Sequence, residues 1–402
     1  MAARSPFCEL TRPANSGPRG PEWSAIFDDG TELRPGEGTH RFTFRVSSRD
    51  ALARILAADA YSAAMAFVRG ECEVTGDLIA AIRFKGWRPQ SGLRERFIRL
   101  VAGGAALLEC AFQSRTRTAR HIRFHYDLSN EFYRLFLDSR MVYSCAYFPS
   151  LDTTLEDAQF AKLNHICRKL DLQASERFLD VGCGWGALVE HAAAQYGAKA
   201  AGCTLSPAQY DYAAARLNGR ARVLECDYRD VIGHYDKIAS VGVFEHVGRR
   251  RALEYFRKIA ALLAPDGLFL HHSIARPQCA RDDAASLFVR RHIFPGGELI
   301  HLHEMMRAAE EAGLEILDVE NLRPHYALTC RLWEQRLAAN GEAAVRLVGG
   351  PAFRAWRLWL AASSLSFEDG FSSVYQVLLG KCGAARRHLT REHIYAGPDR
   401  HV

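Results

Sequence analysis

Two periodicities of hydrophobic and polar residues divide the chain. Strict alternation over residues 41–46 predicts a β-strand, and helical spacing follows from Asp50, behind the capping residue Ser48, and again over residues 60–69. A second short strand and a further helix start complete this region. We interpret residues 39–87 as a small α+β domain, without the clustered His, Cys or carboxylate side chains that would indicate chemistry.

From residue 177 onward, short apolar strands alternate with helical segments. This order predicts a parallel sheet, and the ligands of such sheets bind beyond the carboxyl ends of the strands. Beyond residue 275 the pattern is mainly helical. The strands that we predict are Arg177–Val181, Ala198–Cys203, Ala221–Glu225, Asp236–Val241 and Leu268–His272.

The most informative stretch is Arg177 to Gly186, where a short apolar strand runs into three glycines spaced two residues apart. An Ala-rich helical run follows, so a strand, a glycine turn and a helix start meet where backbone can approach a ligand closely. The dinucleotide fingerprint places its third glycine three positions after the second, whereas here the third glycine follows two positions after the second. Asp180 would repel a pyrophosphate but attract an ammonium group. These features favour S-adenosylmethionine, with an ordinary glycine-rich turn as the alternative.

Composition adds few limits. Hydrophobic residues make up 48% of the chain and charged residues 24%, and the net charge of +6 does not by itself indicate a nucleic-acid partner. The eleven cysteines show no metal-ligand spacing, so we expect no metal site and free thiols in a reducing cytosol. Residues 1–38 are rich in Pro, Gly and charge, which predicts a poorly ordered arm. Since no signal peptide or spanning run is evident, we expect a soluble protein.

Residues 83–123 carry the one pronounced charge asymmetry. Ten Lys or Arg residues stand against Glu95 and Glu109, and aromatic residues such as Phe84 and Trp87 are interleaved with them. A basic, aromatic-bearing stretch suits an anionic membrane surface. A solvated linker between domains is the alternative, and nucleic acid is a weaker third option because no reader motif accompanies the charge.

Several motifs in a fixed order resemble the cyclopropane-fatty-acyl-phospholipid synthase family, which includes the mycolic acid cyclopropane synthases. The resemblance extends from about residue 40 to residue 396. Its most specific parts are His125–Asn130, Tyr143–Phe148, Leu179–Gly186, Phe244–Gly248 and Ile293–Glu298.

The resemblance implies a doubly wound α/β fold with a seven-stranded sheet, typical of S-adenosylmethionine-dependent methyltransferases, with helical insertions that form a lipid pocket. A small N-terminal α+β domain would precede it, joined by a basic linker over residues 88–120 to a catalytic domain over residues 121–402. The implied reaction transfers a methylene group to a cis double bond of a phospholipid acyl chain, which gives a cyclopropane fatty acid. The protein would then be cytoplasmic and peripherally associated with the inner face of the membrane. A homodimer is compatible with this assignment.

By matching motifs, the resemblance also implies which residues hold the cofactor. Many methyltransferases end their second strand in a carboxylate that binds the ribose, whereas this chain has Thr204 and Gln209 nearby, as the family does. For Tyr143 a purely structural role as a core aromatic is the alternative. The implied cofactor residues are Tyr126, Tyr143, Ser144, Asp180, Gly182, Gly184, Gly186, Thr204, Ser206, Gln209, Asp227 and Tyr228.

An alkene is a weak nucleophile, and its attack on a methyl group leaves a carbocation that must lose a proton before the ring closes. Family members are thought to use a bound bicarbonate for this step. The implied cage is Cys145, Glu245, His272, the backbone of Ile274, and Tyr326. Taken singly, Glu245 is equally explained as a carboxylate at a helix N-terminus, and His272 as a core histidine. The neighbouring His271 leaves a one-residue ambiguity in register.

One departure from the family concerns Ser363, which stands where some members carry a cysteine described as active. A cysteine nucleophile at that position is therefore excluded. The alternatives to ring formation are a lipid C-methyltransferase that gives a methyl- or methylene-branched chain, a small-molecule methyltransferase, and a non-catalytic lipid-binding protein. The sequence does not specify acyl-chain length or double-bond position.

Overall fold

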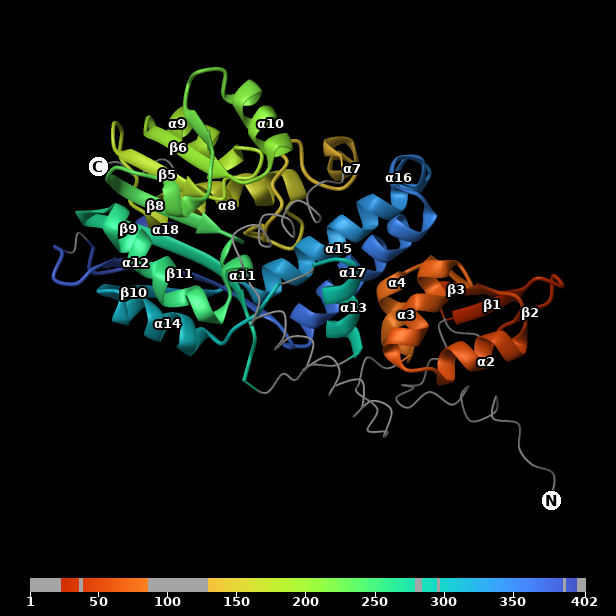
Figure 1. Cartoon of the computed structure of the whole chain (residues 1–402). Helices are drawn as coiled ribbons and strands as arrows, with labels where there is room; N and C mark the ends of the chain where they lie inside the picture. The colour runs from red at the N-terminus through yellow and green to blue at the C-terminus, as the bar shows by residue number, and fades with distance from the viewer. Residues whose placement is uncertain are drawn as a thin grey trace. The chain divides into compact units, whose positions relative to one another are not determined.

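The computed structural model describes residues 23–35, 39–85, 129–278, 284–294, 297–385 and 388–395 (Figure 1). The chain divides into two compact units, each of which is discontinuous in sequence. The smaller unit draws on residues 1–108, 282–295 and 337–365, and the larger unit on residues 109–281, 296–336 and 366–402.

The larger unit is built on a seven-stranded sheet of order β10-β11-β9-β8-β5-β6-β7. Strands β7, β6, β5, β8 and β9 pair in parallel, whereas β11 pairs antiparallel with both β9 and β10. This confirms the predicted fold class. The bounds are β5 Arg177–Val181, β6 Lys199–Thr204, β7 Arg222–Glu225, β8 Tyr235–Val241, β9 Leu263–Ala275, β10 Leu314–Asn321 and β11 Ser373–Lys381.

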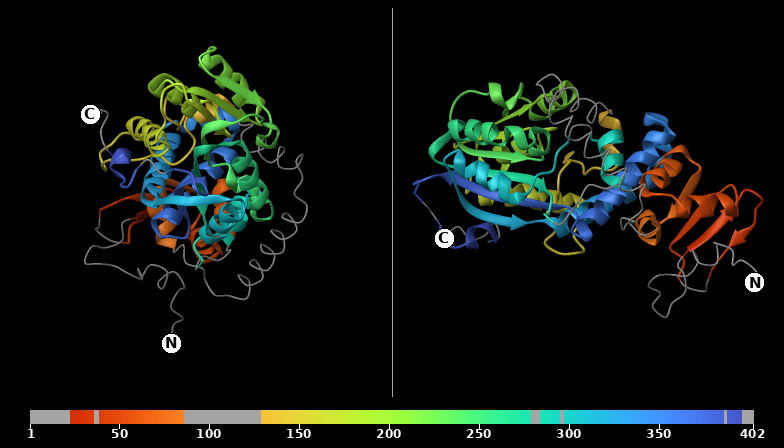
Figure 2. Two further views of the ribbon diagram at one scale, coloured as in Figure 1. Left: turned by 90° about the vertical axis from the view of Figure 1, so that its left-hand side faces the viewer. Right: turned by 60° about the horizontal axis from the view of Figure 1, so that its bottom comes forward.

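Helices cover both faces of this sheet (Figures 1 and 2). Because side chains alternate along a strand, Leu179 and Val181 of β5 pack with α11, α12 and α14, whereas Phe178 packs with α8, α9 and the end of α10. The side chains of β5 thus belong to two separate hydrophobic cores. The bounds are α8 Leu155–Lys169, α9 Ala187–Tyr196, α10 Pro207–Leu217, α11 Phe244–Val247, α12 Ala252–Leu262 and α14 Leu302–Glu311; this unit also holds α7 Asn130–Arg134, α18 Glu392–Tyr395 and most of α15 Arg323–Ala339.

The five strands predicted from the sequence are all present, with ends displaced by a few residues. The expectation that the chain is mainly helical beyond residue 275 was incomplete, because β10 and β11 lie there. One face of β10 carries charged residues, among them Asp318 and Glu320, where a buried strand usually carries apolar ones. These two carboxylates form ion pairs with the buried Lys169. The strand therefore shows no clear alternation.

The smaller unit contains a four-stranded sheet of order β2-β1-β3-β4. Ser48 caps the first helix, as predicted: its side chain accepts a hydrogen bond from the Ala51 N–H. The core also takes side chains from α13 and α17, so this unit is wider in sequence than the predicted 39–87. The bounds are β1 Trp23–Phe27, β2 Glu32–Leu33, β3 Phe42–Val46, β4 Cys72–Gly76, α2 Arg49–Ala57, α3 Ala60–Arg69, α4 Leu78–Lys85, α13 Ala284–His292, α16 Gly341–Val348 and, for the most part, α17 Gly350–Glu368.

The prediction of a poorly ordered arm over residues 1–38 is wrong for residues 23–35. Trp23–Phe27 forms β1, which pairs in parallel with β3 and buries Trp23, Ala25 and Phe27 in the core. That pairing joins segments that are not adjacent along the chain, so local Pro and Gly content did not reveal it. Residues 1–22 and the predicted linker at 88–120 lie outside the described residues. Within the described ranges, no helix is both long and apolar enough to cross a membrane.

Candidate active site

The glycine turn after β5 has the backbone that its sequence predicts. Gly182, Gly184 and Gly186 all have positive φ, between 54° and 82°, where side chains are disfavoured. A Cβ at Gly182 would lie 2.3 Å from Val243 Cγ2, so packing also restricts that position to glycine. At Gly184 a Cβ would meet no atom of the described residues within 4 Å, so no described side chain fills the space beside this glycine.

That space is a cavity bordered by the ends of β5, β6 and β8. Eight of the predicted cofactor residues line it, from four segments that are separate in the sequence. The position agrees with the rule that ligands bind beyond the carboxyl ends of parallel strands. The eight residues are Tyr143, Ser144, Asp180, Gly182, Gly184, Thr204, Gln209 and Tyr228.

Asp180 provides the test of whether a cationic ligand fits this cavity. The residue is 3% exposed, and its Oδ1 has no hydrogen-bond partner within the described structure. A buried polar atom without a partner costs free energy. Burial raises the pKa of Asp180 to about 7, and the positive charge of Lys162 opposes that rise. An unpaired carboxylate oxygen beside the glycine turn fits the ammonium group of S-adenosylmethionine.

The end of β6 supplies neutral polar groups to the cavity instead of a carboxylate. Thr204 Oγ1 donates to Gln209 Oε1 at 2.8 Å, which fixes both side chains against the wall. Ser206 is fully buried, and its hydroxyl caps α10 by accepting from the Gln209 N–H. Ser206 therefore caps α10 and is not among the residues that line the cavity, so its contact with the cofactor stays a prediction.

Three other predicted cofactor residues are not among those that line the cavity. The Asp227 carboxylate is bound by the guanidinium of Arg229, with Nε 2.8 Å from Oδ1, and points to that neighbour. Gly186 packs closely against Ala213: a Cβ added at Gly186 would lie 3.1 Å from the Cβ of Ala213. Tyr126 lies outside the described residues.

Tyr143 stands between the cavity and an aromatic cluster. Its ring centroid lies 5.4 Å from that of Tyr133 and 5.1 Å from that of Trp333, both of which are buried. The side chain itself is only partly buried and lines the cavity. Tyr143 is therefore both a packed aromatic and a wall of the site.

Several residues that line the cavity were not predicted from the sequence to do so, among them Lys162 and Val243. Lys162 is the most informative, because it is a buried lysine on α8. A signal was present: Leu155, Gln159, Lys162 and Ile166 recur at helical spacing on the buried face of that helix. Gln159 and Lys162 are polar residues at core-facing positions of α8, and this pattern indicates that the helix borders a binding site.

The predicted anion cage begins with Glu245 on α11, which is 4% exposed. Its Oε1 accepts from the Ile274 N–H at 2.6 Å, and its Oε2 has no hydrogen-bond partner within the described structure. Burial raises the pKa of Glu245, against the hydrogen bond from Ile274. The carboxyl group is thus fixed at Oε1 by the Ile274 N–H, and a hydrogen bond with the Ser273 side chain also opposes the rise of its pKa.

The two neighbouring histidines of β9 belong to different faces of the sheet. His272 Nδ1 lies 3.2 Å from Gln376 Nε2 of β11, and burial lowers the pKa of His272, so the ring is neutral. His271 instead packs edge-on against Phe244 in the core on the other face. The two rings thus lie on opposite faces of β9, with His272 on the face shared with Ile274.

Contacts through β9 and β11 link the remaining cage residues. Cys145 Sγ donates to the Leu322 carbonyl at 3.8 Å, the Leu322 N–H donates to the Val374 carbonyl, and Val374 pairs with Ile274. Tyr326 lies one helical turn after Leu322, and its N–H donates to the Leu322 carbonyl. The ring of Tyr326 stacks on that of Phe367, with ring centroids 4.5 Å apart. The five predicted residues thus gather around one part of the sheet, but none of them lines the cofactor cavity.

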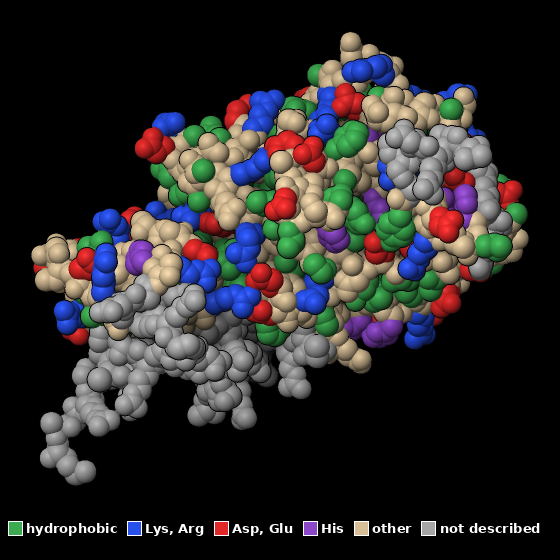
Figure 3. Space-filling view, turned by 180° about the vertical axis from the view of Figure 1, so that it is seen from behind, with side chains coloured by type: hydrophobic (Ala, Val, Ile, Leu, Met, Phe, Trp, Pro, Cys, Tyr) green, Lys and Arg blue, Asp and Glu red, His purple; other side chains and the backbone are tan. Residues whose placement is uncertain are grey.

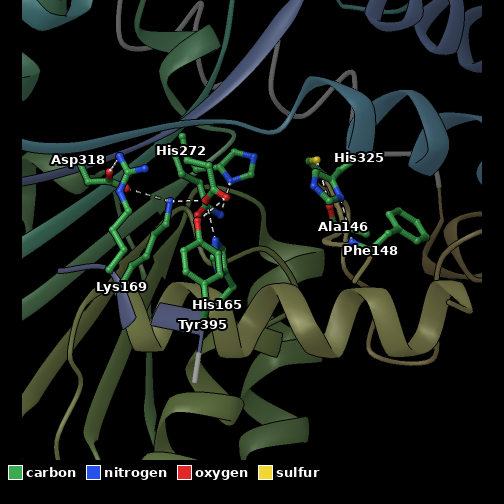
Figure 4. Close-up of polar contacts among 12 residues, drawn as sticks. Ala146, Phe148, His165, Lys169, His272, Asp318, His325 and Tyr395 are labelled. Carbon is green, nitrogen blue, oxygen red and sulfur yellow. Dashed lines mark hydrogen bonds and ion pairs between the residues drawn. The ribbon is translucent and has the colours of Figure 1, made fainter. Parts of the chain in front are cut away.

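A buried ionic cluster occupies the same face as His272. Lys169 Nζ lies 2.6 Å from Glu320 Oε2, and His165 Nε2 lies 2.7 Å from the same oxygen. Figure 4 shows the side chains of Lys169, His165 and Tyr395 converging there, and Asp318 beside them is paired with Arg391. Burial raises the pKa of Glu320, but the hydrogen bond from His165 and the charge of Lys169 outweigh it and lower the pKa to about 2.

We expect Tyr395→Phe to lower the free energy of unfolding by about 0.5–1 kcal/mol at neutral pH, because its hydroxyl donates to Glu320 Oε1 and the tyrosine is half exposed. The pKa of Glu320 is depressed, so its contribution is present above the unfolded value of 4.5 and is lost as the pH falls through about 2. Urea unfolding of both proteins should show the difference shrinking in acid. A difference that is constant with pH would contradict this account.

The fold and the cavity together define a methyltransferase that depends on S-adenosylmethionine. Over residues 113–377 the chain matches the family described as mycolic acid cyclopropane synthetase, and it belongs to that family. It is 38% identical over 343 residues to the "Probable fatty acid methyltransferase" of Pseudomonas putida, covering 82% of this chain and 85% of that protein. It is 30% identical over 336 residues to the sphingolipid C9-methyltransferase of Komagataella phaffii, covering 78% and 68%.

A solved structure with the same fold is that of a mycolic acid cyclopropane synthase complexed with SAH and CTAB. It superimposes with a TM-score of 0.63 and 34% identity, covering 65% of this chain and 98% of that chain. SAH is the product form of the cofactor, so this relative supports S-adenosylmethionine as the methyl donor of this enzyme.

Proposed function

We propose that this enzyme transfers a methylene group from S-adenosylmethionine to a cis double bond of a phospholipid acyl chain and forms a cyclopropane ring. The observation that carries the proposal is Glu245, whose Oε1 is fixed by the Ile274 N–H while its buried Oε2 has no partner within the described structure. That oxygen fits the hydroxyl group of a bicarbonate ion, which would supply a base close to the reacting carbon. A methyl transfer to an amine needs no such base.

In the cofactor cavity, S-adenosylmethionine would supply an electrophilic methyl group. Asp180 would receive its ammonium group, and the glycine turn would let backbone approach it closely. Thr204 and Gln209 would offer neutral donors and acceptors from the end of β6. These residues hold and orient the donor, which is the main requirement when the acceptor is as weak a nucleophile as an alkene.

Around the anion, each residue has a separate task. His272 is held by Gln376, and Tyr326 is held by stacking on Phe367, so both offer polar groups in fixed positions. Burial keeps the Cys145 thiol protonated, since its pKa lies well above the ordinary value, so the thiol serves as a weak donor and not as a nucleophile. The aromatic face of Tyr326 can also attract positive charge that develops on the acyl chain.

The second candidate is a lipid C-methyltransferase whose product carries a methyl or methylene branch. It is favoured by relatives whose names are fatty acid methyltransferase and sphingolipid C9-methyltransferase. Ser363, on α17, excludes a cysteine nucleophile at that position and does not distinguish the two products. The residues that hold the donor would be the same in both reactions.

Mass spectrometry of lipids from cells that express the enzyme tests the proposal. A cyclopropane adds the mass of one methylene to an unsaturated chain and removes its double bond, whereas a methyl branch on a saturated chain differs from the ring by two hydrogens. Unaltered lipids together with normal binding of SAH would favour a lipid-binding protein without activity. Absence of SAH binding would overturn the assignment of the cavity.

We also propose peripheral contact with an anionic membrane through the basic residues between 83 and 123, most of which lie outside the described residues. On the face seen in Figure 3, basic and acidic side chains of the described residues are interspersed instead of gathered. The membrane contact is therefore assigned to this stretch and not to that face.

Liposome binding checks this assignment. We expect binding to anionic vesicles to weaken steeply as salt shortens the screening length below about 8–10 Å. Arg117→Gln should cost about 1 kcal/mol of binding free energy, because each charge near the surface contributes about that much. Vesicles of neutral lipid are the control. Binding that ignores both salt and lipid charge would reduce the stretch to a linker.

A further inference from the structure

One buried cation beside the cofactor cavity has no part in the function proposed above. Lys162, on α8, is 2% exposed and lines the cavity. Its Nζ donates to the hydroxyl of Ser144 at 2.9 Å. A buried ammonium group costs several kcal/mol unless other charges and hydrogen bonds offset it. The position of Lys162 therefore calls for a compensating partner.

Two carboxylates face this lysine from different segments. Asp180 lies on the face of β5 that also carries Phe178, and Phe178 packs with Leu163 and Ile166 of α8. Asp138, after α7, is buried and accepts from the N–H groups of Val142 and Arg140. Their charges raise the pKa of Lys162, but burial outweighs them and lowers it to about 8.

Five further titratable groups whose charges would act on Lys162 or Asp180 are neutral near pH 7. Burial lowers the pKa of His191 to about 4, and it also lowers the pKa of His272. Burial raises the pKa values of Cys145, Cys167 and Cys183, so these thiols are protonated. Lys162 is therefore the charge that stabilises the ionised form of Asp180.

The same helix face holds the segment that carries Ser144. Gln159 Nε2 donates to the Ser144 carbonyl at 2.9 Å, one turn before Lys162. Gln159 thus fixes the backbone of this segment without charge, whereas Lys162 fixes its hydroxyl with charge. The two residues differ in the one property that a titration detects.

We propose that Lys162 is a positioning residue for the cofactor: its ammonium group holds the Ser144 hydroxyl at the cavity wall and keeps Asp180 ionised to receive the ammonium group of the ligand. This role rests on the assignment of the cavity to S-adenosylmethionine. Lys162 does not react itself. It acts through Asp180 and Ser144, so its removal changes how affinity depends on pH.

The test compares Lys162→Met with Gln159→Leu by titrating each full-length protein with SAH from about pH 6 to about pH 8.5. The affinity of the wild type should rise as the pH passes about 7, where Asp180 ionises. In Lys162→Met that rise should move up by about one pH unit or more, which weakens binding about fivefold or more at pH 7. Gln159→Leu should weaken SAH binding by the same factor at every pH. The pH midpoint of the rise in affinity should stay unchanged.

An unchanged midpoint in Lys162→Met would overturn the proposal. If that variant does not fold, proton exchange in the wild type decides the matter: binding of SAH below about pH 7, followed in buffers of different ionisation heat, should release protons as Asp180 ionises. Binding without proton release would also overturn the proposal. A wild type that does not bind SAH at all would instead refute the assignment of the cavity.

Discussion

Glu245→Gln should lower the rate of ring formation by about 10²-fold or more and leave SAH affinity nearly constant. The substitution keeps the shape of a buried side chain whose Oε1 accepts from the Ile274 N–H. It can, however, place a donor where Oε2 offers an acceptor. Loss of the contact that orients the base costs a rate factor of this size. Methyl transfer from labelled S-adenosylmethionine, with mass spectrometry of the product lipid, measures the effect.

The matched control is Glu334→Gln, which replaces another buried glutamate of the larger unit that we do not assign to the cage. It should retain ring formation. Added bicarbonate should partly restore Glu245→Gln if only the affinity for the anion has fallen, and methyl-branched or hydroxylated lipid should accumulate. Full activity of Glu245→Gln in buffer stripped of carbonate would leave Glu245 as a structural carboxylate.

Gly184→Val should abolish binding of S-adenosylmethionine and SAH without unfolding the protein. A Cβ at residue 184 would meet no atom of the described residues within 4 Å, and Gly184 lines the cavity, so a side chain there would take up cavity space. It would occupy the space that the ligand needs beside the backbone. Isothermal titration with SAH measures the loss, and circular dichroism confirms that the fold is retained.

Gly219→Val provides the control, because Gly219 also has positive φ and a Cβ there would meet no atom of the described residues within 4 Å, yet Gly219 does not line the cavity. Both variants carry the same backbone strain, which is about 1 kcal/mol. The strain should lower the stability of both by similar amounts, and only Gly184→Val should lose the ligand. Normal affinity in Gly184→Val would place the cofactor elsewhere.

The sequence by itself determined the parts of the site that local chemistry encodes. Three glycines at a spacing of two require positive φ, and all three adopt it. Asp180 is the last residue but one of an apolar strand, so it had to lie near the carboxyl end of that strand, beside the turn. The strands from β5 to β9 were predicted because their apolar residues are contiguous. Thr204 and Gln209 were placed correctly because they follow one of these strands directly.

Only the tertiary structure decided which groups face one another. The pairing of β1 with β3 joins Trp23–Phe27 to Phe42–Val46, and β11 pairs with β9 across about a hundred residues of sequence. The position of Lys162 beside the cofactor cavity, and the separation of His271 from His272, depend on which strand face packs against which helix. Such contacts are set by burial and pairing between distant segments, and no local pattern carries them.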